Sequence, residues 1–381
     1  MRVFNRKTGI LLSGGVLFAA LLAGCGSGNG GNTAGNASTG TSPQQSSTPQ
    51  SSTGATVNLT GAGSTFDNPL FSAMFPDYER AHPNVKINYQ SIGSGGGIQA
   101  LTNKEVDFGA SDAPLKPDQE QAVGGADAVV HIPVTIGPAA IFYNLPGVDK
   151  LQLDGTTLTK IFAGKITKWN DPAIAADNPG VKLPSNNIVV AHRSDGSGTT
   201  SIITHYFAAV DPQDWPESNA STSPDWHNVG VGAKGTEGVA STVRSTKYSI
   251  GYGELSYAKQ SNMPVVWVKN KAGKFVEPTV EAASAAAAQF QLPADGKIYI
   301  VNADGADSYP ITGFSWVIVY TKQTDATKGK ELVNLLKWMI TDGQSKAASL
   351  YYAPLPDSVQ QFGLHQLQKI TGPDGQPLLQ Q

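Results

Sequence analysis

The chain has 381 residues, enough for two domains, and its 40% of hydrophobic residues can form a sizeable core. Its formal net charge of −3 excludes the strongly basic surface that nucleic-acid-binding domains need. A single cysteine excludes a disulfide framework within the chain, and the six scattered histidines form no HExxH zinc motif.

Residues 1–24 are expected to form a signal peptide. Three basic residues, Arg2, Arg6 and Lys7, precede the apolar run 9–22, which is shorter than the roughly 20 residues that span a bilayer. The sequence LAGC (22–25) resembles the bacterial lipobox, in which the cysteine is lipidated and becomes the new N-terminus. The alternative is an ordinary secretory signal with an incidental cysteine. The lipobox interpretation predicts an extracytoplasmic protein that a lipid on Cys25 anchors to a bacterial membrane.

A linker is expected to follow, so that residues 25–56 comprise the lipidated cysteine and a flexible segment. Residues 26–55 contain only Gly, Ser, Thr, Asn, Gln, Pro and Ala, with no charged or aromatic side chain. Such a composition cannot form a packed core. About 30 residues of this kind reach about 30 Å as a coil, so the segment would act as a leash.

From residue 57 onward, strand-like and helix-like segments alternate, which predicts an α/β fold with a doubly wound arrangement. Alternating or continuous apolar residues predict strands at 85–92, 188–190 and 314–320. Apolar residues at helical spacing predict helices over 70–78, 98–101, 202–207 and 332–339. The Asn68-Pro69 pair suits the first turn of the helix at 70–78.

Four polar, glycine-rich segments lie at the expected strand-to-helix junctions or in loops: 61–66, 93–97, 107–114 and 193–200. Unpaired backbone N–H groups at a helix N-terminus bind anions, glycines allow close approach, and Ser or Thr hydroxyls add donors. The alternative for each segment taken alone is a plain helix N-cap. No segment matches the phosphate-binding loop of nucleotide-binding proteins, because Ser197-Gly198-Thr199-Thr200 lacks its lysine.

Two charged residues in these segments suggest which anion is bound. Arg193 would supply the one charged contact; its alternative is a salt bridge with Asp195. Asp112 would repel an anion unless that anion carries a proton for the carboxylate to accept. Phosphate carries a proton near neutral pH and sulfate does not, so Asp112 would admit phosphate and reject sulfate. The alternative for Asp112 is a turn or N-cap aspartate before Pro114.

With these residues in place, the chain resembles the phosphate-binding proteins of bacterial phosphate-specific ABC transporters. The resemblance runs in order from about residue 59 to 356. It rests on TGAGSTF (60–66), YQSIGSGGG (89–97), VDFGASDAPL (106–115), KITKWNDPAI (165–174), RSDGSGTT (193–200), GTEGV (235–239), SIGYGELSYA (249–258) and GQSKAASLYYAPLP (343–356).

The resemblance implies a two-lobed periplasmic-binding-protein fold of α/β class, each lobe a mixed sheet flanked by helices, with the ligand cleft between the lobes. Lobe one would comprise 57–134 plus 309–381, and lobe two 135–308. Phosphate would accept from the Phe66 backbone N–H and donate its proton to Asp112. The implied phosphate-binding residues are Thr65, Phe66, Ser94, Asp112, Arg193, Asp195, Ser197, Gly198 and Thr199. By contrast, Tyr252 and Glu254 are expected to be structural.

The expected function is that of a monomeric receptor that binds inorganic phosphate and delivers it to the permease subunits of an ABC transporter. We expect no cofactor, no metal, no nucleic-acid partner and no enzymatic activity. Two alternatives are a receptor for another oxyanion, such as sulfate, molybdate or phosphonate, and a phosphatase. A surface protein for signalling or adhesion is a third, and it would bind no such ligand saturably.

Overall fold

The computed structural model describes residues 55–379. The predictions for the leader, for Cys25 and for nearly all of the linker fall outside these residues. All of the described residues belong to one unit of the fold, Thr53–Gln381. Among them, no helix is both long enough and apolar enough to cross a membrane.

The described chain opens with parallel strands joined by helices. Strand β1 (Val57–Gly63) pairs in parallel with β2 (Val85–Ser91) on one side and with β3 (Phe108–Ser111) on the other. Helix α1 (Asn68–Ala81) connects β1 to β2, and α2 (Ser94–Thr102) connects β2 to β3. This order places the carboxyl ends of all three strands at one edge of the sheet.

Two long strands run through the middle of the sheet. Strand β4 (Val129–Asn144) pairs antiparallel with β11 (Thr312–Tyr320) through residues 129–138, and with β8 (Ser249–Glu254) through residues 139–144. All of β4 except its last residue is buried, as expected for a strand covered on both faces. Because β4 changes partner along its length, it joins the two halves of the sheet.

The rest of this sheet repeats the parallel pattern. Strand β6 (Val189–Arg193) pairs in parallel with β8 and with β7 (Val231–Ala233). Helix α6 (Gly198–Val210) follows β6, and α7 (Gly235–Ser245) follows β7. Within the described chain the full strand order is β2-β1-β3-β11-β4-β8-β6-β7.

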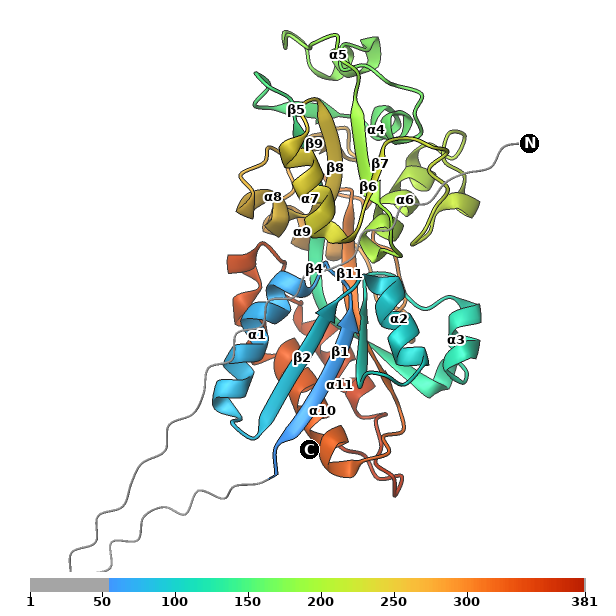
Figure 1. The fold of residues 1–381 in the computed structure, drawn as a ribbon, viewed down its shortest axis with the longest axis vertical. Coiled ribbons are helices and arrows are strands. Elements are labelled where there is room, and N and C mark those ends of the chain that lie inside the picture. The colour runs from blue at the N-terminus through green and yellow to red at the C-terminus, as the bar shows by residue number, and fades with distance from the viewer. Residues whose placement is uncertain (1–54, 380–381) are drawn as a thin grey trace, which may run out of the picture. The chain divides into compact units, whose positions relative to one another are not determined.

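Smaller elements complete the fold (Figure 1). A separate sheet has the order β10-β9-β5 and consists of β5 (Leu151–Leu153), β9 (Val266–Lys269) and β10 (Phe275–Val276). The remaining α-helices are α3 (Pro117–Val123), α4 (Gly155–Phe162), α5 (Pro172–Asp177), α8 (Leu255–Gln260), α9 (Val280–Ala287), α10 (Ala326–Ile340) and α11 (Asp357–Leu367). Short 3-10 helices are η1 (Ala126–Ala128), η2 (Glu217–Asn219), η3 (Asp342–Lys346) and η4 (Ala348–Leu350).

The apolar side chains gather into distinct cores. One core joins residues near the start of the described chain, such as Leu59 and Phe71, to C-terminal residues such as Leu336. Figure 1 shows the blue β1 close to α10, which it contacts, while α11 packs on α10 and β4. Two further cores are built from residues 139–311. The change from the first core to the others falls within β4, between Ile136 and Ala139.

The strands and helices expected from apolar periodicity are confirmed, with one difference in extent. The glycines of 93–97 were expected to precede a short helix, but α2 begins at Ser94 and includes Gly95, Gly96 and Gly97. A Cβ on Gly97 would lie 2.4 Å from the Cα of Gly63 in β1. The helix therefore packs backbone against backbone on β1, and this contact outweighs the low helix propensity of glycine.

Candidate functional site

Four segments predicted to bind an anion meet at one place, which we call the Arg193 cluster. They contribute Thr65 after β1, Ser94 at the start of α2, Asp112 after β3, and residues 193–199 between β6 and α6. Ser94 Oγ joins two of them, because it accepts from Gly198 N at 3.0 Å and from Asp112 N at 3.3 Å. The side chains that meet at its centre are almost completely buried, with Arg193 3% exposed and Asp112 1%, whereas Asp195 is half-buried.

The guanidinium of Arg193 is held on two sides. Its Nε donates to Asp195 Oδ1 at 2.7 Å and its Nη2 to Asp195 Oδ2 at 2.5 Å. Its Nη1 donates to Thr65 Oγ1 at 2.9 Å and to Thr236 Oγ1 at 3.2 Å. Burial acts against the charge of Asp195, but the guanidinium holds the pKa of that carboxyl below its usual value. The salt bridge considered for Arg193 is thus present, and the same side chain also reaches across to Thr65.

Asp112 is surrounded by hydroxyl donors. Ser64 Oγ donates to its Oδ1, and Thr199 Oγ1 donates to its Oδ2 at 3.1 Å. Ser315 Oγ lies 3.2 Å from Oδ1, but its shorter hydrogen bond, of 2.7 Å, is to Asp67 Oδ2. Burial raises the pKa of Asp112 to about 6, while these hydroxyls and Arg193 act in the opposite direction. These hydrogen bonds favour the ionised carboxylate, which can accept from a further, proton-bearing group.

The N-terminus of α6 closes against these residues. Ser197 is the N-cap, and its Oγ accepts from Thr200 N at 3.1 Å, which is the plain capping role considered for this segment. A Cβ on Gly198 would lie 2.6 Å from Ser94 Oγ and 2.7 Å from Asp112 Oδ2. Only glycine fits at that position without displacing its neighbours.

Tyrosine hydroxyls fix the backbone of 64–66. Tyr89 donates to the carbonyl of Ser64 at 2.7 Å, Tyr257 to that of Thr65 at 3.0 Å and Tyr352 to that of Phe66 at 2.6 Å. The Phe66 side chain itself is fully buried and meets the Tyr352 ring edge-on at 5.7 Å between centroids. A ligand contact by Phe66 would therefore come from its backbone.

Several residues of the cluster were missed as site residues or assigned a structural role. Ser64 and Ser315 contact Asp112, and Thr236 contacts both Thr65 and Arg193. Glu254 Oε1 lies 2.9 Å from Thr199 Oγ1. Ser64, Thr236 and Glu254 all lie in the segments that carry the resemblance, whereas the only signal for Ser315 is a polar residue within an apolar strand.

The arrangement suits binding of a small oxyanion. His192, the histidine closest in sequence to Ser197, stacks on Trp226 at 4.5 Å, and its Nδ1 lies 3.0 Å from the carbonyl oxygen of Arg193. Within residues 55–379, no three His, Cys, Asp or Glu side chains are grouped to hold a metal ion. One buried cation, several hydroxyls and a carboxylate acceptor match an anion that carries a proton.

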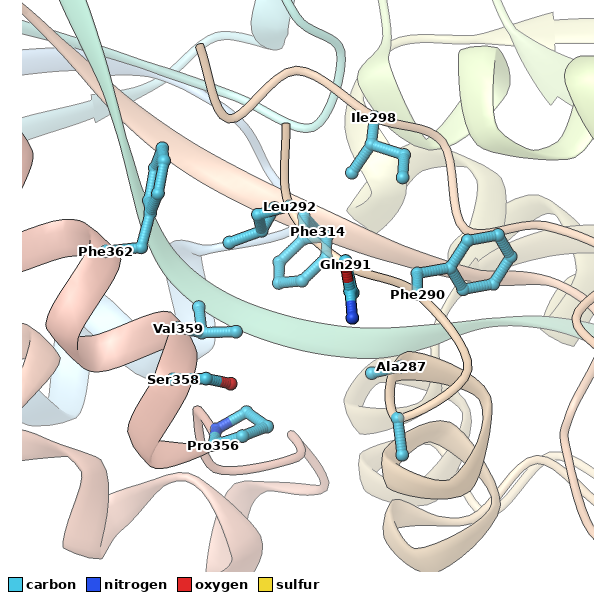
Figure 2. Close-up of a pocket in the computed structure, with 11 residues that line it drawn as sticks. Ala287, Phe290, Gln291, Leu292, Ile298, Phe314, Pro356, Ser358, Val359 and Phe362 are labelled. Carbon is cyan, nitrogen blue, oxygen red and sulfur yellow. The ribbon is translucent and has the colours of Figure 1, made fainter. Parts of the chain in front are cut away.

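A separate apolar cavity of about 570 Å³ lies between α9, β11 and α11 (Figure 2). Its walls include Phe290, Leu292, Phe314 and Phe362, and none of its lining residues belongs to the Arg193 cluster. Its lining offers no charged side chain. The cavity is therefore distinct from the Arg193 cluster in position and in chemistry.

Comparisons with known proteins agree with the fold and with the resemblance. Residues 41–342 match a family model described as a PBP superfamily domain. The chain is 41% identical over 330 residues to phosphate-binding protein PstS of Xylella fastidiosa strain Temecula1, covering 85% of this chain and 89% of that protein. It is 42% identical over 307 residues to PstS of Haemophilus influenzae, covering 79% of this chain and 90% of that protein.

Solved structures give the same fold. A high-affinity periplasmic phosphate-binding protein solved with phosphate superposes with a TM-score of 0.66 at 20% identity, covering 84% of this chain and all of that one. A phosphate-binding protein from Stenotrophomonas maltophilia gives a TM-score of 0.62 at 20% identity, covering 80% and 92%. The predicted periplasmic-binding-protein fold is thereby confirmed.

Proposed function

Because the chain belongs to the PstS family of phosphate-binding proteins, we propose that it binds inorganic phosphate at the Arg193 cluster. The observation that carries the proposal is the buried Asp112 in the same cluster as the Arg193 guanidinium. Beside the guanidinium, a carboxylate can contact a bound anion favourably only if the anion carries a proton, as phosphate does near neutral pH. The proposed phosphate-binding residues are Thr65, Phe66, Ser94, Asp112, Arg193, Asp195, Ser197, Gly198 and Thr199.

We propose that these residues divide between two lobes, 57–134 plus 309–381 and 135–308, which close on the ligand. The change of core within β4, between Ile136 and Ala139, supports the first boundary, whereas Tyr309 and Ile311 still pack in the second core. Hydrogen bonds between the two sets support a closed arrangement: Gly95 N donates to the carbonyl of Gly196 at 3.0 Å, and Arg193 reaches Thr65. Closure would exclude water and strengthen each hydrogen bond to the anion.

Selectivity would follow from the fixed acceptor. Hydroxyls of Ser64 and Thr199 already donate to Asp112, and the ionised carboxylate that they stabilise can only accept from a further group. A protonated phosphate satisfies such a group, whereas sulfate would place two acceptors against each other. Receptors for sulfate or molybdate, which carry no proton near neutral pH, lack this reason to keep a buried carboxylate, and a sulfate titration tests that alternative.

We further propose that the chain passes its phosphate to the permease subunits of an ABC transporter. The lipobox-like sequence LAGC (22–25) supports an extracytoplasmic protein held at the membrane by a lipid on Cys25. A monomer without enzymatic activity suffices for this role. Mass spectrometry of the protein isolated from membranes would detect a diacylglyceryl group on Cys25, and a cysteine without lipid would contradict the anchor.

The test of phosphate binding is calorimetric titration of the purified chain, freed of bound ligand, with phosphate and separately with sulfate. We expect one phosphate per chain and no heat from sulfate. Saturable sulfate binding would move the chain to another oxyanion class. Release of phosphate from a phosphomonoester by the purified chain would support the phosphatase alternative instead.

A further inference from the structure

Glu254, the last residue of β8, lies behind the Arg193 cluster and was expected to be structural. Its side chain is 1% exposed. Its Oε1 lies 2.9 Å from Thr199 Oγ1, and the same hydroxyl lies 3.1 Å from Asp112 Oδ2. The Thr199 hydroxyl therefore stands between two carboxyl groups.

A count of protons distinguishes the two acids. A hydroxyl has one proton and can donate to only one carboxylate at a time. If both acids were ionised, the oxygen of Thr199 would face one carboxylate oxygen with no proton between them. This repulsion between two oxygen acceptors is removed when one of the two acids is protonated and donates to Thr199 Oγ1. Thr199 can then donate its own proton to the other acid.

Glu254 is the better candidate to hold that proton. Asp112 receives a further hydroxyl from Ser64, which stabilises its ionised form; Ser315 Oγ lies 3.2 Å from Asp112 but donates at 2.7 Å to Asp67 Oδ2. Glu254 receives only a long contact from Thr236 Oγ1 at 3.5 Å, and its buried Oε2 has no hydrogen-bond partner. An unpartnered oxygen is far less costly on a neutral acid than on a buried carboxylate.

We infer that Glu254 is a positioning residue of the anion site, a neutral acid that donates to Thr199 so that Thr199 donates to Asp112. This inference rests on the proposed binding of phosphate. The relay from Glu254 through Thr199 keeps Asp112 in its ionised, accepting form, ready for the proton of the anion. Glu254 itself does not need to touch the ligand.

The surroundings of Glu254 favour its neutral form. Burial is the main cause, and the charge of Asp112 adds to it; together they raise the pKa of Glu254 to about 8, although Arg193 and Thr199 act in the opposite direction. The titratable groups that face Glu254 from the neighbouring elements are Asp67, Asp112, Arg193, Tyr257 and Tyr352, with Glu237 next to Tyr257. Burial keeps the pKa of both tyrosines well above 10, so they stay neutral at the pH values of the test.

Loss of the proton would weaken binding in a measurable way. Ionised Glu254 competes with Asp112 for the Thr199 proton and adds a buried negative charge near the anion. If only the protonated form is competent, the competent fraction falls from about 0.9 at pH 7 to about 0.1 at pH 9, so Kd rises about tenfold. Substitutions that cannot ionise remove this rise.

The experiment compares phosphate Kd values at pH 7 and pH 9, measured by calorimetry on the full purified chain. Between these two values, wild-type Kd is expected to increase about tenfold more than that of Glu254→Gln. The ionisation of free phosphate changes both chains equally and cancels in this comparison. Glu105→Gln, at an exposed glutamate, is the matched control and is expected to follow the wild type.

Glu254→Met is the second variant in case Glu254→Gln does not fold, since it has similar length and also cannot ionise. Its affinity at pH 7 is expected to be lower because Thr199 loses its donor, but its pH dependence should match that of Glu254→Gln. Equal pH dependence of the wild type and the variants would overturn the inference while leaving the proposed function intact. Absence of phosphate binding by the wild type at pH 7 would overturn both.

Discussion

Arg193 Nη1 donates a hydrogen bond of 2.9 Å to Thr65 Oγ1, joining two residues that lie 128 positions apart in the chain. The other edge of the same guanidinium is held by Asp195. Asp195 thus fixes the plane of the forked guanidinium. Its Nη1 edge, bonded to Thr65, links the end of β6 to the segment after β1. Both parts of this contact depend on the planar shape of the guanidinium.

Replacing Arg193 by lysine is therefore expected to weaken phosphate binding by roughly 100-fold or more. The ammonium keeps the charge, but it cannot hold Asp195 at two points and reach Thr65 as well. Calorimetry measures the loss. Arg80→Lys is the control, because Arg80 forms an exposed pair with Asp77 and such pairs contribute little. Equal affinity of Arg193→Lys and the wild type would contradict the role assigned to the fork.

Replacing Asp112 by asparagine is expected to weaken phosphate binding roughly 10- to 100-fold, the effect of losing a charged hydrogen bond in a buried site. The same change should improve sulfate binding, because the new amide N–H can donate to an unprotonated oxygen. The two anions are titrated in parallel. Asp307→Asn, at a side chain that is 89% exposed, is the matched control. A variant that still rejects sulfate as strongly as the wild type would show that selectivity lies elsewhere.

Gly198→Ala tests how tightly α6 closes on the cluster. The added Cβ would meet Ser94 Oγ and Asp112 within 2.7 Å, so α6 must move away and phosphate affinity should fall at least roughly tenfold. Gly238→Ala is the matched control within α7, where the nearest atom to the new Cβ is 3.4 Å away. The control is expected to bind normally. Equal affinities of the two variants would mean that the closed contact at Gly198 is not needed.

Much of the fold was predictable because its signal is local. The alternation of Val85, Ile87 and Tyr89 marks β2, and the buried run 314–320 marks most of β11. The start of α2 was not predictable, because the low helix propensity of glycine argues against a helix at residues 94–97. Only the close contact between Gly97 and Gly63 explains why the helix begins there.

The site shows the same division. The glycine-rich segments pointed to Asp112 and Arg193, but Ser315 meets Asp112 only through the pairing of β11 with β3. Glu254 likewise reaches Thr199 only through the pairing of β8 with β6. Register between distant strands is not encoded in any short stretch of sequence, so neither side chain could be placed in the site.

The buried acid of Glu254 also makes a prediction for the unliganded protein. Burial raises its pKa from 4.5 to about 8 in the folded state, so folding favours the protonated form. A raised pKa contributes stability that is complete below the unfolded value of 4.5 and is lost as the pH rises toward 8. Glu254→Gln cannot ionise at this position, so its stability has no such pH-dependent contribution.

The melting temperature of the wild type relative to Glu254→Gln should therefore be lower at pH 8.5 than at pH 5, by roughly 5 °C. Burial also raises the pKa of Asp67 and Asp112, which are present in both chains; because the charge of Glu254 adds to the pKa of Asp67, the difference contains this coupling as well as the ionisation of Glu254 itself. Thermal unfolding without phosphate measures this difference, and a value that is the same at both pH values would show that Glu254 is ionised in the folded protein throughout.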